Sequence, residues 1–339
     1  MREGIPRRPT IIDVAAKAGV SKSMVSLVMR GSSDVREEKR RLVLEAADAL
    51  GYRPNAVARS LVRRRTNMLG VVLSDLHNPF FTEVIDGIEA EAEDRSYRTI
   101  ICTASRQSSA ERRALDTLLE LRADALILAS PMIEMDAIAR ASAEVPVVLV
   151  ARPSDSEAID SVANDDPTGA ALVVDHLVAL GHRRIAHVDG GGGAGAAARS
   201  AGYVQAMQRH GLDAHVRVIP GSYTDEGGRQ GVAALLASGE RPTAIFVAND
   251  LAALGAMSEL AERGLRVPDD MSLVGYDNTS LAAVRHISLT TVDQPRPQMG
   301  RQAVTLVLER LTRDRTTSRH ILIPPRLVVR GTTAAPAVR

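Results

Sequence analysis

The residues that first suggest chemistry are glycines that follow a short apolar run. In the stretch RRIAHVDGGGGAGAAARSAGY (183–203), Gly190, Gly192 and Gly195 match the pattern G-x-G-x-x-G. This spacing lets a strand-to-helix turn bring its backbone close to the pyrophosphate of a dinucleotide. The run before the glycines has the composition of a strand, and a helix-like stretch follows them. The motif admits a nicotinamide- or flavin-dependent oxidoreductase, although five glycines in six positions also produce the match by composition.

A dinucleotide site also needs an acidic residue at the end of the next strand, roughly 20 residues further on, to bind the ribose hydroxyls. The next expected strand is HVRVIP (215–220), and it does not end in an acid: Asp213 precedes it and Asp225 lies beyond it. We therefore interpret the glycines as a mobile loop, because glycine adopts many backbone conformations.

Other catalytic patterns are absent from the sequence, which contains no G-x-S-x-G, H-E-x-x-H or P-loop motif. His176 and His182 are six residues apart across a helix end, a spacing that does not place them on one face to share a metal. The pair Asp165–Asp166 suggests acid–base chemistry, but it also suits the cap of a helix that starts at Pro167, with one carboxylate facing a ligand. We expect no catalytic residue, no metal and no cofactor.

Length and composition indicate a multidomain protein of the cytoplasm. The chain has 339 residues, 45% of them hydrophobic, enough for two or three domains with a sizeable core. No apolar run approaches the roughly 18 residues of a membrane span, and the N-terminus lacks the features of a signal peptide. The single cysteine, Cys102, lies in a strand-like segment, where we expect a buried, inert thiol.

Positive charge is concentrated in the first fifth of the chain. Residues 1–65 carry 15 lysines and arginines against 7 acids, a net charge of +8, whereas the remainder carries −7. Only this segment is therefore a credible surface for a polyanion such as DNA.

The same segment has the pattern of three short helices. Thr10 and Asp13 have the spacing of a helix cap, Gly19 suits a turn, and Ser21 suits the cap of a second helix. A third helix is expected within 36–52. Apolar residues expected to form the shared core are Ile11, Val14, Ala15, Ala18, Val25, Val28, Met29, Leu42, Val43, Ala46, Ala49 and Leu50. Two helices joined by a tight glycine turn predict a helix-turn-helix that binds the DNA major groove, with a generic helical bundle as the alternative.

From Met68 onward, strand-like runs alternate with helical patterns. This alternation predicts α/β architecture with two doubly wound parallel sheets. Strands are expected at 69–73, 98–102, 125–129, 146–150, 184–188, 215–220, 243–248, 272–276 and 320–323. Helices are expected at 81–95, 110–122, 166–181 and 250–264, among others.

The whole chain resembles the lactose-repressor/galactose-repressor (LacI/GalR) family of bacterial transcription regulators. The segments that carry the resemblance are TIIDVAAKAGVSKSMVSLVMRG (10–31), RRLVLEAADALGYRPNAVARSL (40–61), GVVLSDLHNPFF (70–81), HLVALGHRRIAHVDG (176–190), AIFVANDLAALGAM (244–257), SLVGYDNTSLAAVRHISLTTVDQP (272–295) and LVVRGTT (327–333). They follow the family's order along the chain.

The resemblance implies an all-α helix-turn-helix headpiece joined to an α/β, periplasmic-binding-protein-like core of two doubly wound parallel-sheet lobes. The headpiece would span residues 1–52, a hinge helix 53–66, and the effector-binding and dimerisation core 67–339. The first lobe would comprise about 67–163 and 293–320, and the second about 164–292 and 321–339. The chain would therefore cross between the lobes near Ala163, Asp293 and His320.

The resemblance also implies which residues contact DNA. Lys22, Ser23 and Leu27 would read bases at the start of the recognition helix. The residues implied for further contacts are Thr10, Ser21, Ser26, Arg30 and Tyr52 in the headpiece and Asn55, Ala58 and the minor-groove wedge Leu61 in the hinge. Family members usually carry threonine, arginine and asparagine where this chain has Met24, Leu27 and Arg30. Leucine offers a base only apolar contact, so the family's usual half-site does not carry over.

For the effector cleft, the resemblance implies residues from both lobes. They are Ser74, Pro79, Phe80, Phe81, Arg106, Asp166, Arg199, Asn249, Asp277 and Gln294. Such carboxylates, amides and arginines suit a polyhydroxylated ligand, and the glycines would border the cleft. Several sugar-binding members have aspartate where this chain has Ala151, followed here by Arg152. That arginine suggests an acidic sugar or phosphate, or an ion pair with Asp155 or Asp160.

These observations predict a cytoplasmic, homodimeric, effector-controlled repressor that binds a palindromic DNA operator. Two alternatives are a solute-binding protein, which two lobes alone would permit, and an oxidoreductase that depends on the glycine cluster. The basic helical headpiece and the missing signal peptide argue against the first. The identity of the effector, its action as inducer or corepressor, and the operator sequence stay open.

Overall fold

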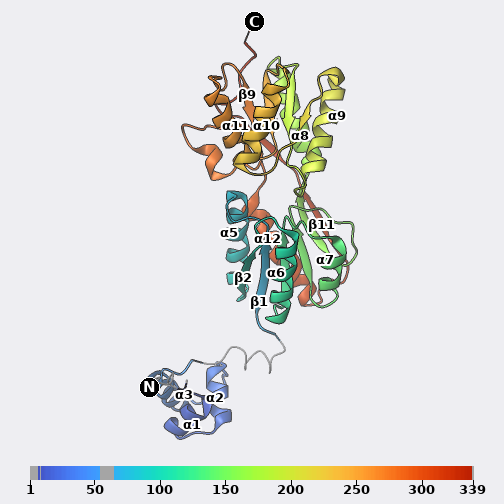
Figure 1. Ribbon diagram of the computed structural model, residues 1–339. Helices are drawn as coiled ribbons and strands as arrows, with labels where there is room; N and C mark the ends of the chain where they lie inside the picture. Colours follow the sequence, from blue (N-terminus) through green and yellow to red (C-terminus); the bar gives the residue numbers. More distant parts are fainter. Residues whose placement is uncertain (1–6, 8, 54–64, 338–339) are drawn as a thin grey trace, which may run out of the picture. The chain divides into compact units, whose positions relative to one another are not determined.

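The computed structural model describes residue 7, residues 9–53 and residues 65–337, and it divides into two units, Met1–Thr66 and Asn67–Arg339 (Figure 1). The hinge positions Asn55, Ala58 and Leu61 lie outside the described residues. None of the described helices combines the length and the apolarity needed to cross a membrane.

The first unit contains three helices, α1 (Ile11–Ala18), α2 (Lys22–Met29) and α3 (Glu37–Ala49). The expected caps are present. Thr10 accepts a hydrogen bond from the backbone of Asp13, whose carboxylate accepts in return from the Thr10 backbone at 2.7 Å. Gly19 ends α1 with a φ of 67°, and Ser21 caps α2 through the backbone of Met24. The tight turn between α1 and α2 therefore has the chemistry that the sequence predicts.

The core of this unit differs from the expected core in helix α3. Val14, Val25, Val28 and Val43 are buried as expected. The same core contains Ala15 and Ala46, which were also expected, and Val35 and Ala47, which were not. Leu42, however, is 39% exposed, and Ala49 is also exposed. Ala47 occupies the buried position, so the face of α3 that packs inward is rotated from the expected one.

The first lobe of the core is a six-stranded parallel sheet in the order β11-β5-β4-β3-β1-β2. Its strands are β1 (Met68–Leu73), β2 (Arg98–Thr103), β3 (Ala125–Ala129), β4 (Val147–Val150), β5 (Asp160–Asn164) and β11 (His320–Ile323). Its helices are α5 (Pro79–Asp94), α6 (Ser108–Glu120), α7 (Met135–Ser142) and α12 (Arg296–Leu311). The central strands β3 and β4 are buried along their whole length, as expected for a sheet covered on both faces.

The second lobe contains a four-stranded parallel sheet in the order β7-β6-β8-β9 and a two-stranded antiparallel pair, β10 with β12. Its strands are β6 (Ile185–Val188), β7 (Val218–Ile219), β8 (Ala244–Val247), β9 (Ser272–Val274), β10 (Thr291–Asp293) and β12 (Arg326–Val328). Its helices are α8 (Asp166–Ala179), α9 (Ala196–Arg209), α10 (Asp225–Ala237) and α11 (Asp250–Glu262), with short 3₁₀ turns at Asp213–His215 and Ser280–Ala283.

Helix α12, late in the sequence, packs on α5 of the first lobe at backbone contact. A Cβ atom on Gly87 would lie 2.0 Å from the Pro297 carbonyl oxygen, and one on Gly300 would lie 2.2 Å from that of Val84. Both glycines are therefore required for this approach, because any side chain would separate the helices.

Several details of the core differ from expectation: the sequence does not predict β10 or β12, and the strand expected at 215–220 is shortened to β7. Strand β5 was missed because its sequence, DSVAN, begins and ends with residues that strands disfavour. Strand β11 pairs with β5, so the third crossing follows Ile323 rather than His320. Cys102, on the edge strand β2, is half-buried rather than buried, and burial raises the pKa of its thiol.

Candidate functional site

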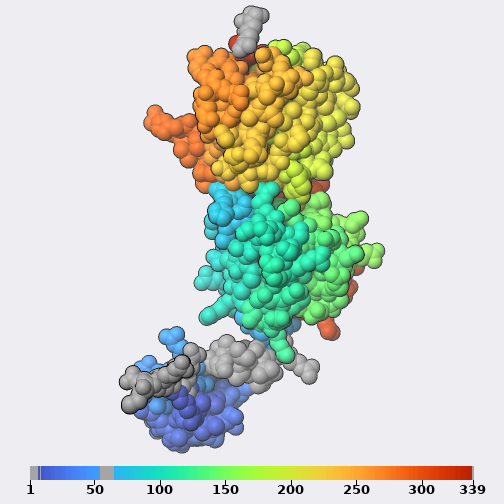
Figure 2. Space-filling model, viewed as in Figure 1, coloured from blue at the N-terminus to red at the C-terminus, as the bar shows by residue number. Residues whose placement is uncertain are grey.

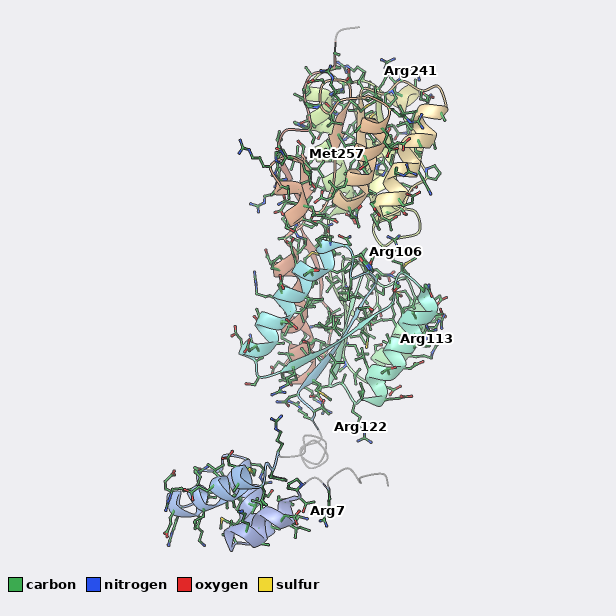
Figure 3. All side chains as sticks on the ribbon, turned by 60° about the vertical axis from the view of Figure 1, so that its left-hand side comes forward. Arg7, Arg106, Arg113, Arg122, Arg241 and Met257 are labelled. Atoms are coloured by element: carbon green, nitrogen blue, oxygen red, sulfur yellow. The ribbon has the colours of Figure 1, made fainter. Side chains whose placement is uncertain are left out.

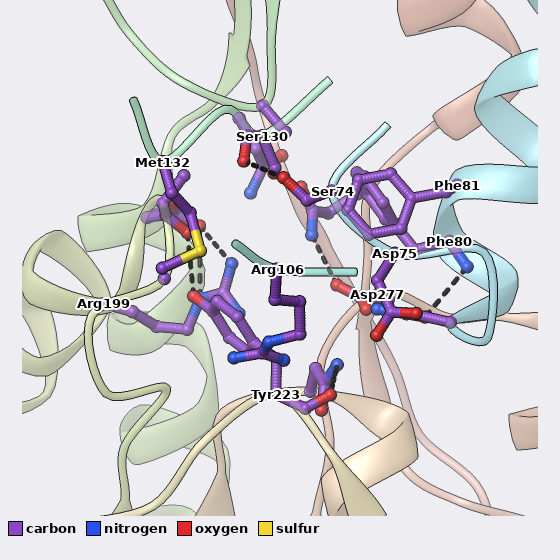
Figure 4. A pocket seen from close by; sticks show the side chains of 18 residues that line it. Ser74, Asp75, Phe80, Phe81, Arg106, Ser130, Met132, Arg199, Tyr223 and Asp277 are labelled. Atoms are coloured by element: carbon purple, nitrogen blue, oxygen red, sulfur yellow. Dashed lines mark hydrogen bonds and ion pairs between the residues drawn. The ribbon is translucent and has the colours of Figure 1, made fainter. Parts of the chain in front are cut away.

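The candidate site is a pocket between the two lobes of the core, where the yellow and orange second lobe meets the cyan and green first lobe in Figure 2. It holds about 630 Å³ free of protein atoms, its open mouth included. The lining residues follow the carboxyl ends of strands from both sheets, the usual location of ligands in open α/β folds. They are Ser74, Asp75, Asn78, Phe80, Phe81, Arg106, Ser130, Met132, Ala151, Asn164, Asp166, Gly193, Ala194, Arg199, Tyr223, Asn249, Asp277 and Gln294 (Figure 4).

Of the ten residues implied by the resemblance, all but Pro79 line this one pocket. Pro79 instead starts α5 and lines a neighbouring surface groove with Leu76 and Glu83. The structure adds residues that the sequence analysis did not select, above all Asn164 and Tyr223. Asn164 is the last residue of β5, and Tyr223 lies in the loop after β7. Their place at the carboxyl ends of strands is the signal that could have identified them.

Arg199 is the buried centre of the second-lobe wall. It donates to the Asp166 carboxylate at 2.8 Å and to the Ala248 carbonyl. Its guanidinium carbon lies 3.6 Å from the centre of the Tyr276 ring. Burial alone would lower the pKa of Arg199, but the surrounding groups, Asp166 foremost and then Tyr223, Tyr276 and Asp277, together outweigh burial and raise the pKa. The arginine is therefore a permanent cation held in one position.

The pair of acids after β5 divides its work as the sequence suggests. Asp165 caps α8 by accepting from the Thr168 backbone at 3.1 Å. Asp166 turns toward the pocket and pairs with Arg199. The arrangement leaves one carboxylate for the helix and one for the cleft.

Tyr223 lies against the glycine loop that suggested a dinucleotide site. Its hydroxyl donates to the Ala194 carbonyl at 2.9 Å. A Cβ atom on Gly190 or Gly193 would come within 2.5 or 2.3 Å of the ring, whereas one on Gly192 would meet nothing. The start of α9, where a pyrophosphate would bind, instead faces Asp166: a Cβ atom on Gly195 would lie 2.4 Å from its Oδ2. The glycines thus make room for an aromatic ring and a carboxylate.

Arg106 reaches from the first lobe toward this aromatic ring. Its guanidinium carbon lies 6.0 Å from the centre of the Tyr223 ring, and it stands between the lobes in Figure 3. The cation and the ring therefore face each other across the pocket, from opposite lobes.

Asp277 is a buried carboxyl group at the junction between the lobes. Gln294 donates to its Oδ1 at 2.6 Å, and Arg296 donates to its backbone carbonyl. Arg296 also donates to Glu83 of α5 at 2.9 Å, which connects Asp277 with the first lobe. Burial, followed by the charge of Asp250, raises the pKa of Asp277 to about 8. Burial therefore favours the protonated form of Asp277, which can donate a hydrogen bond to a ligand.

Unusual backbone conformations are concentrated around the pocket. Four lining residues other than glycine have positive φ: Arg106 (59°), Ser130 (49°), Ala151 (57°) and Asp277 (113°). Non-glycine residues adopt this region at a cost of order 1–3 kcal/mol each, and such residues are concentrated at functional sites. The backbone strain therefore supports this pocket as the functional site.

Arg152 does not take either role considered for it. It donates to the carbonyls of Pro131 and Ile133 at 2.9 and 2.7 Å and does not line the pocket. Asp160 pairs instead with Arg315 at 2.7 Å. Arg152 thus holds the loop after β3, and the suggestion of an acidic ligand loses its support.

The loop after β3 is fixed from its other side by a buried acid. Glu111 accepts from the backbones of Met132 and Ile133 at 2.7 and 2.8 Å, and from the Ser74 hydroxyl at 2.9 Å. Ser74, Ser130 and Met132 therefore reach the pocket from a rigid wall.

Two buried histidines of the second lobe are structural. His187 is fully buried between Ser200 and the Phe246 carbonyl, and burial lowers its pKa to about 4, so it is neutral. His182 bonds Thr243 and Ser272. Within the part of the chain that the structure describes, no group of three or more histidine, cysteine or acidic side chains is arranged to hold a metal ion.

A second candidate surface lies at the start of α2 in the first unit. Ser21, Lys22 and Ser23 are exposed there, and Arg30, at the opposite end of α2, is exposed as well. Leu27 is half-buried and packs partly against the core of this unit, as do Met24 and Tyr52. Leu27 therefore presents only part of its side chain to a ligand.

Comparison with known proteins relates both surfaces to one family. Residues 10–55 match the family described as bacterial regulatory proteins, lacI family. Residues 66–331 match periplasmic binding proteins and sugar binding domain of the LacI family. The chain belongs to the LacI family.

Relatives of this LacI-family regulator match it along nearly its whole length. Catabolite control protein A of Priestia megaterium is 35% identical, over 96% of this chain and 99% of its own. The transcriptional repressor PurR of Photobacterium profundum is 34% identical, over 95% and 97%. A crystal structure of the Lac repressor dimer bound to operator and the anti-inducer ONPF superposes with a TM-score of 0.85 at 32% identity, covering 97% of this chain and all of the other. The chain is thus a DNA-binding transcriptional regulator.

Proposed function

We propose that this chain is a repressor that binds a palindromic operator as a homodimer and responds to a small, sugar-like effector in the pocket between its lobes. The observation that carries the proposal is the combination, on one chain, of a basic helix-turn-helix and a polar pocket at the carboxyl ends of two sheets. The protein acts by binding alone, in the cytoplasm, and needs no cofactor.

The proposed operator contacts begin at the exposed end of α2. Lys22 and Ser23 are exposed there and read base edges, while Leu27 adds apolar contact, for example to a thymine methyl. Ser21 and the nearby hydroxyls position the helix on phosphates. The residues proposed for this positioning are Thr10, Ser21, Ser26, Arg30 and Tyr52. In the hinge, Asn55 and Ala58 accompany Leu61, which wedges into the minor groove and kinks the duplex.

The proposed effector carries several hydroxyl groups. The pocket offers carboxyl, amide and guanidinium groups that make paired hydrogen bonds, and the Phe80, Phe81 and Tyr223 rings supply apolar surface. Solved relatives support this class: one structure is a CelR–cellobiose complex, and another holds bound ribose. The proposed contacts are Ser74, Phe80, Phe81, Arg106, Asp166, Arg199, Asn249, Asp277 and Gln294.

The proposed switch is a change in the relative orientation of the two lobes. A ligand that contacts both walls favours one orientation, and it shifts DNA affinity only by its differential affinity for the two states. The coupling is reciprocal, so operator DNA must change effector affinity by the same factor. Arg106 and Tyr223, which face each other from opposite lobes, are placed to respond to such a ligand.

The test is selection of genomic DNA fragments on the full chain, with residues 67–339 alone as the control. We expect the full chain to enrich a palindrome and the truncated chain to enrich none. Thermal-shift measurements with D-ribose, cellobiose and other sugars on both proteins then identify ligands of the core. Tight palindrome binding by the truncated chain would contradict the proposal.

The solute-binding protein considered from the sequence is not supported, because residues 10–55 match the DNA-binding domain of the lacI family. It predicts sugar binding without sequence-specific DNA binding. The same selection experiment therefore separates the two functions.

A further inference from the structure

Asn164 has a buried oxygen without a hydrogen-bond partner. It ends β5, the strand after which the chain enters the second lobe, and its side chain is 5% exposed and lines the pocket. Its Oδ1 is one of two buried side-chain polar atoms without a partner among the described residues. The other belongs to Gln302 and does not line the pocket.

The orientation of the Asn164 amide follows from the groups beside it. Its Nδ2 donates to the Tyr276 hydroxyl at 2.6 Å. That hydroxyl has one hydrogen, and the Asp166 carboxylate, which accepts from Arg199, is close enough to act as a further hydrogen-bond partner that raises the pKa of Tyr276. Because an ionised carboxylate only accepts, Tyr276 must donate to it and must accept from Asn164. This chain of bonds fixes Nδ2 toward Tyr276 and leaves Oδ1 without a donor.

An unpaired buried carbonyl is costly, at about 1–3 kcal/mol. Native proteins almost always satisfy such a group with protein, ordered water or a ligand. Since the described protein groups do not satisfy Oδ1, and the atom belongs to a pocket-lining residue, the missing donor must come from within the pocket.

We propose that Oδ1 of Asn164 accepts a hydrogen bond from an O–H or N–H group of the bound effector and thereby selects ligands with a donor at that position. The inference rests on the proposed effector function and adds to it a specificity-determining residue. A sugar hydroxyl and the amine of a nucleoside share this donor chemistry.

The position of Asn164 also connects this bond with the junction between the lobes. Asn164 belongs to the first sheet, whereas Tyr276 follows β9 of the second. The side-chain bond between them spans 112 residues of sequence. A ligand that binds Oδ1 therefore contacts a residue that already joins the lobes, so that occupancy of the pocket acts directly on their junction.

The first test compares three versions of the full chain by calorimetric titration with D-ribose, cellobiose and adenosine. Asn164→Leu removes both polar atoms of the amide but keeps the branched outline of the side chain, and Asn164→Asp keeps an acceptor oxygen in place. For any compound that binds the wild type, we expect Asn164→Leu to weaken binding at least about tenfold and Asn164→Asp to recover most of it. Melting temperatures without ligand show whether each variant is folded. Equal affinities of wild type and a folded Asn164→Leu would overturn the proposal.

The second test is a high-resolution crystal structure of the ligand-free full chain. It shows whether Oδ1 of Asn164 lacks a protein donor, even if none of the three compounds binds. We expect an ordered water within about 3.2 Å of Oδ1, holding the place of the effector's donor. A protein donor on Oδ1, or an amide turned so that Tyr276 donates to Oδ1, would overturn the proposal. Failure of the wild type to select an operator would instead count against the proposed function and leave this result unaffected.

Discussion

A Cβ atom on Gly193 would lie 2.3 Å from the Cε2 atom of Tyr223. The positions that need glycine because of close contacts are Gly190, Gly191, Gly193 and Gly195, whereas the dinucleotide pattern needs Gly190, Gly192 and Gly195. The two explanations of the loop therefore make opposite predictions for Gly192 and Gly193, and this difference makes them separable.

We expect Gly193→Ala to lower the free energy of unfolding of the core by about 1–3 kcal/mol, because the added methyl group displaces the Tyr223 ring. Gly192→Ala is the matched control, since its Cβ meets nothing within 4 Å. Its effect should stay within about 0.5 kcal/mol. Urea unfolding measures both. If Gly192→Ala lowered the free energy of unfolding and Gly193→Ala left it unchanged, contact with Tyr223 would not explain the glycines. The dinucleotide explanation of the loop would then return.

The basic headpiece predicts a steep salt dependence of operator binding. Two headpieces that make on the order of 8 phosphate contacts should give a slope of about −7 for log K against log salt. Fluorescence anisotropy between low and moderate salt measures it. A slope near zero would show that phosphate contacts do not supply the affinity.

Lys22→Ala should reduce the preference for the palindrome over other DNA, because Lys22 is proposed to read bases. Ser26→Ala should weaken binding to all DNA without changing that preference, because Ser26 is proposed to contact phosphates.

Leu27→Arg should change the preferred half-site. Arginine makes a bidentate contact to guanine that leucine cannot make, worth about 1–3 kcal/mol at one base position. Because Leu27 is half-buried, the longer side chain should extend outward past the core of the headpiece. Selection from randomised sites with both proteins checks this, and identical sequence preferences would contradict base reading at this position.

Arg199→Ala should abolish the response of operator binding to a sugar that binds the wild type. The variant loses the cation of the pocket and leaves Asp166 buried without its partner, so its stability should also fall, by about 3–5 kcal/mol. Melting curves control for unfolding, and Arg199→Lys separates charge from the two-pronged geometry of the guanidinium group. If a folded Arg199→Ala still responded to the sugar at the concentration that acts on the wild type, Arg199 would not belong to the effector site.

The stability of the core should fall as pH rises through neutrality. The folded pKa of Asp277 is about 8, against an ordinary value of 3.8, so the folded protein binds the extra proton between these values. Its contribution is complete below the ordinary value and is lost as pH rises through about 8. Between about pH 6 and pH 8 the unfolding free energy should fall by up to about 1.4 kcal/mol per pH unit. Urea titrations at several pH values should show that the unfolding free energy of Asp277→Asn changes less with pH than that of the wild type. An equal change in both proteins would contradict a raised pKa for Asp277.

Features with local causes were predictable from the sequence. The capping box of Thr10 and Asp13, the left-handed Gly19 and the Ser21 cap each depend on residues at most four positions apart. The alternation of strands and helices likewise follows from periodicity within each segment. The resemblance to a family correctly predicted nine residues that line one pocket, and these residues lie at or near the carboxyl ends of strands.

The tertiary structure alone decided which distant groups are partners. Asn164 bonds Tyr276 across 112 residues, and Asp160 pairs with Arg315 across 155. Arg152 donates to the carbonyls of Pro131 and Ile133 in the loop after β3, and it pairs with neither Asp155 nor Asp160. Leu42 became exposed because the packing of three helices set the rotation of α3. A local pattern states what a side chain can bond, whereas only the packed chain determines which group lies within 3 Å of it.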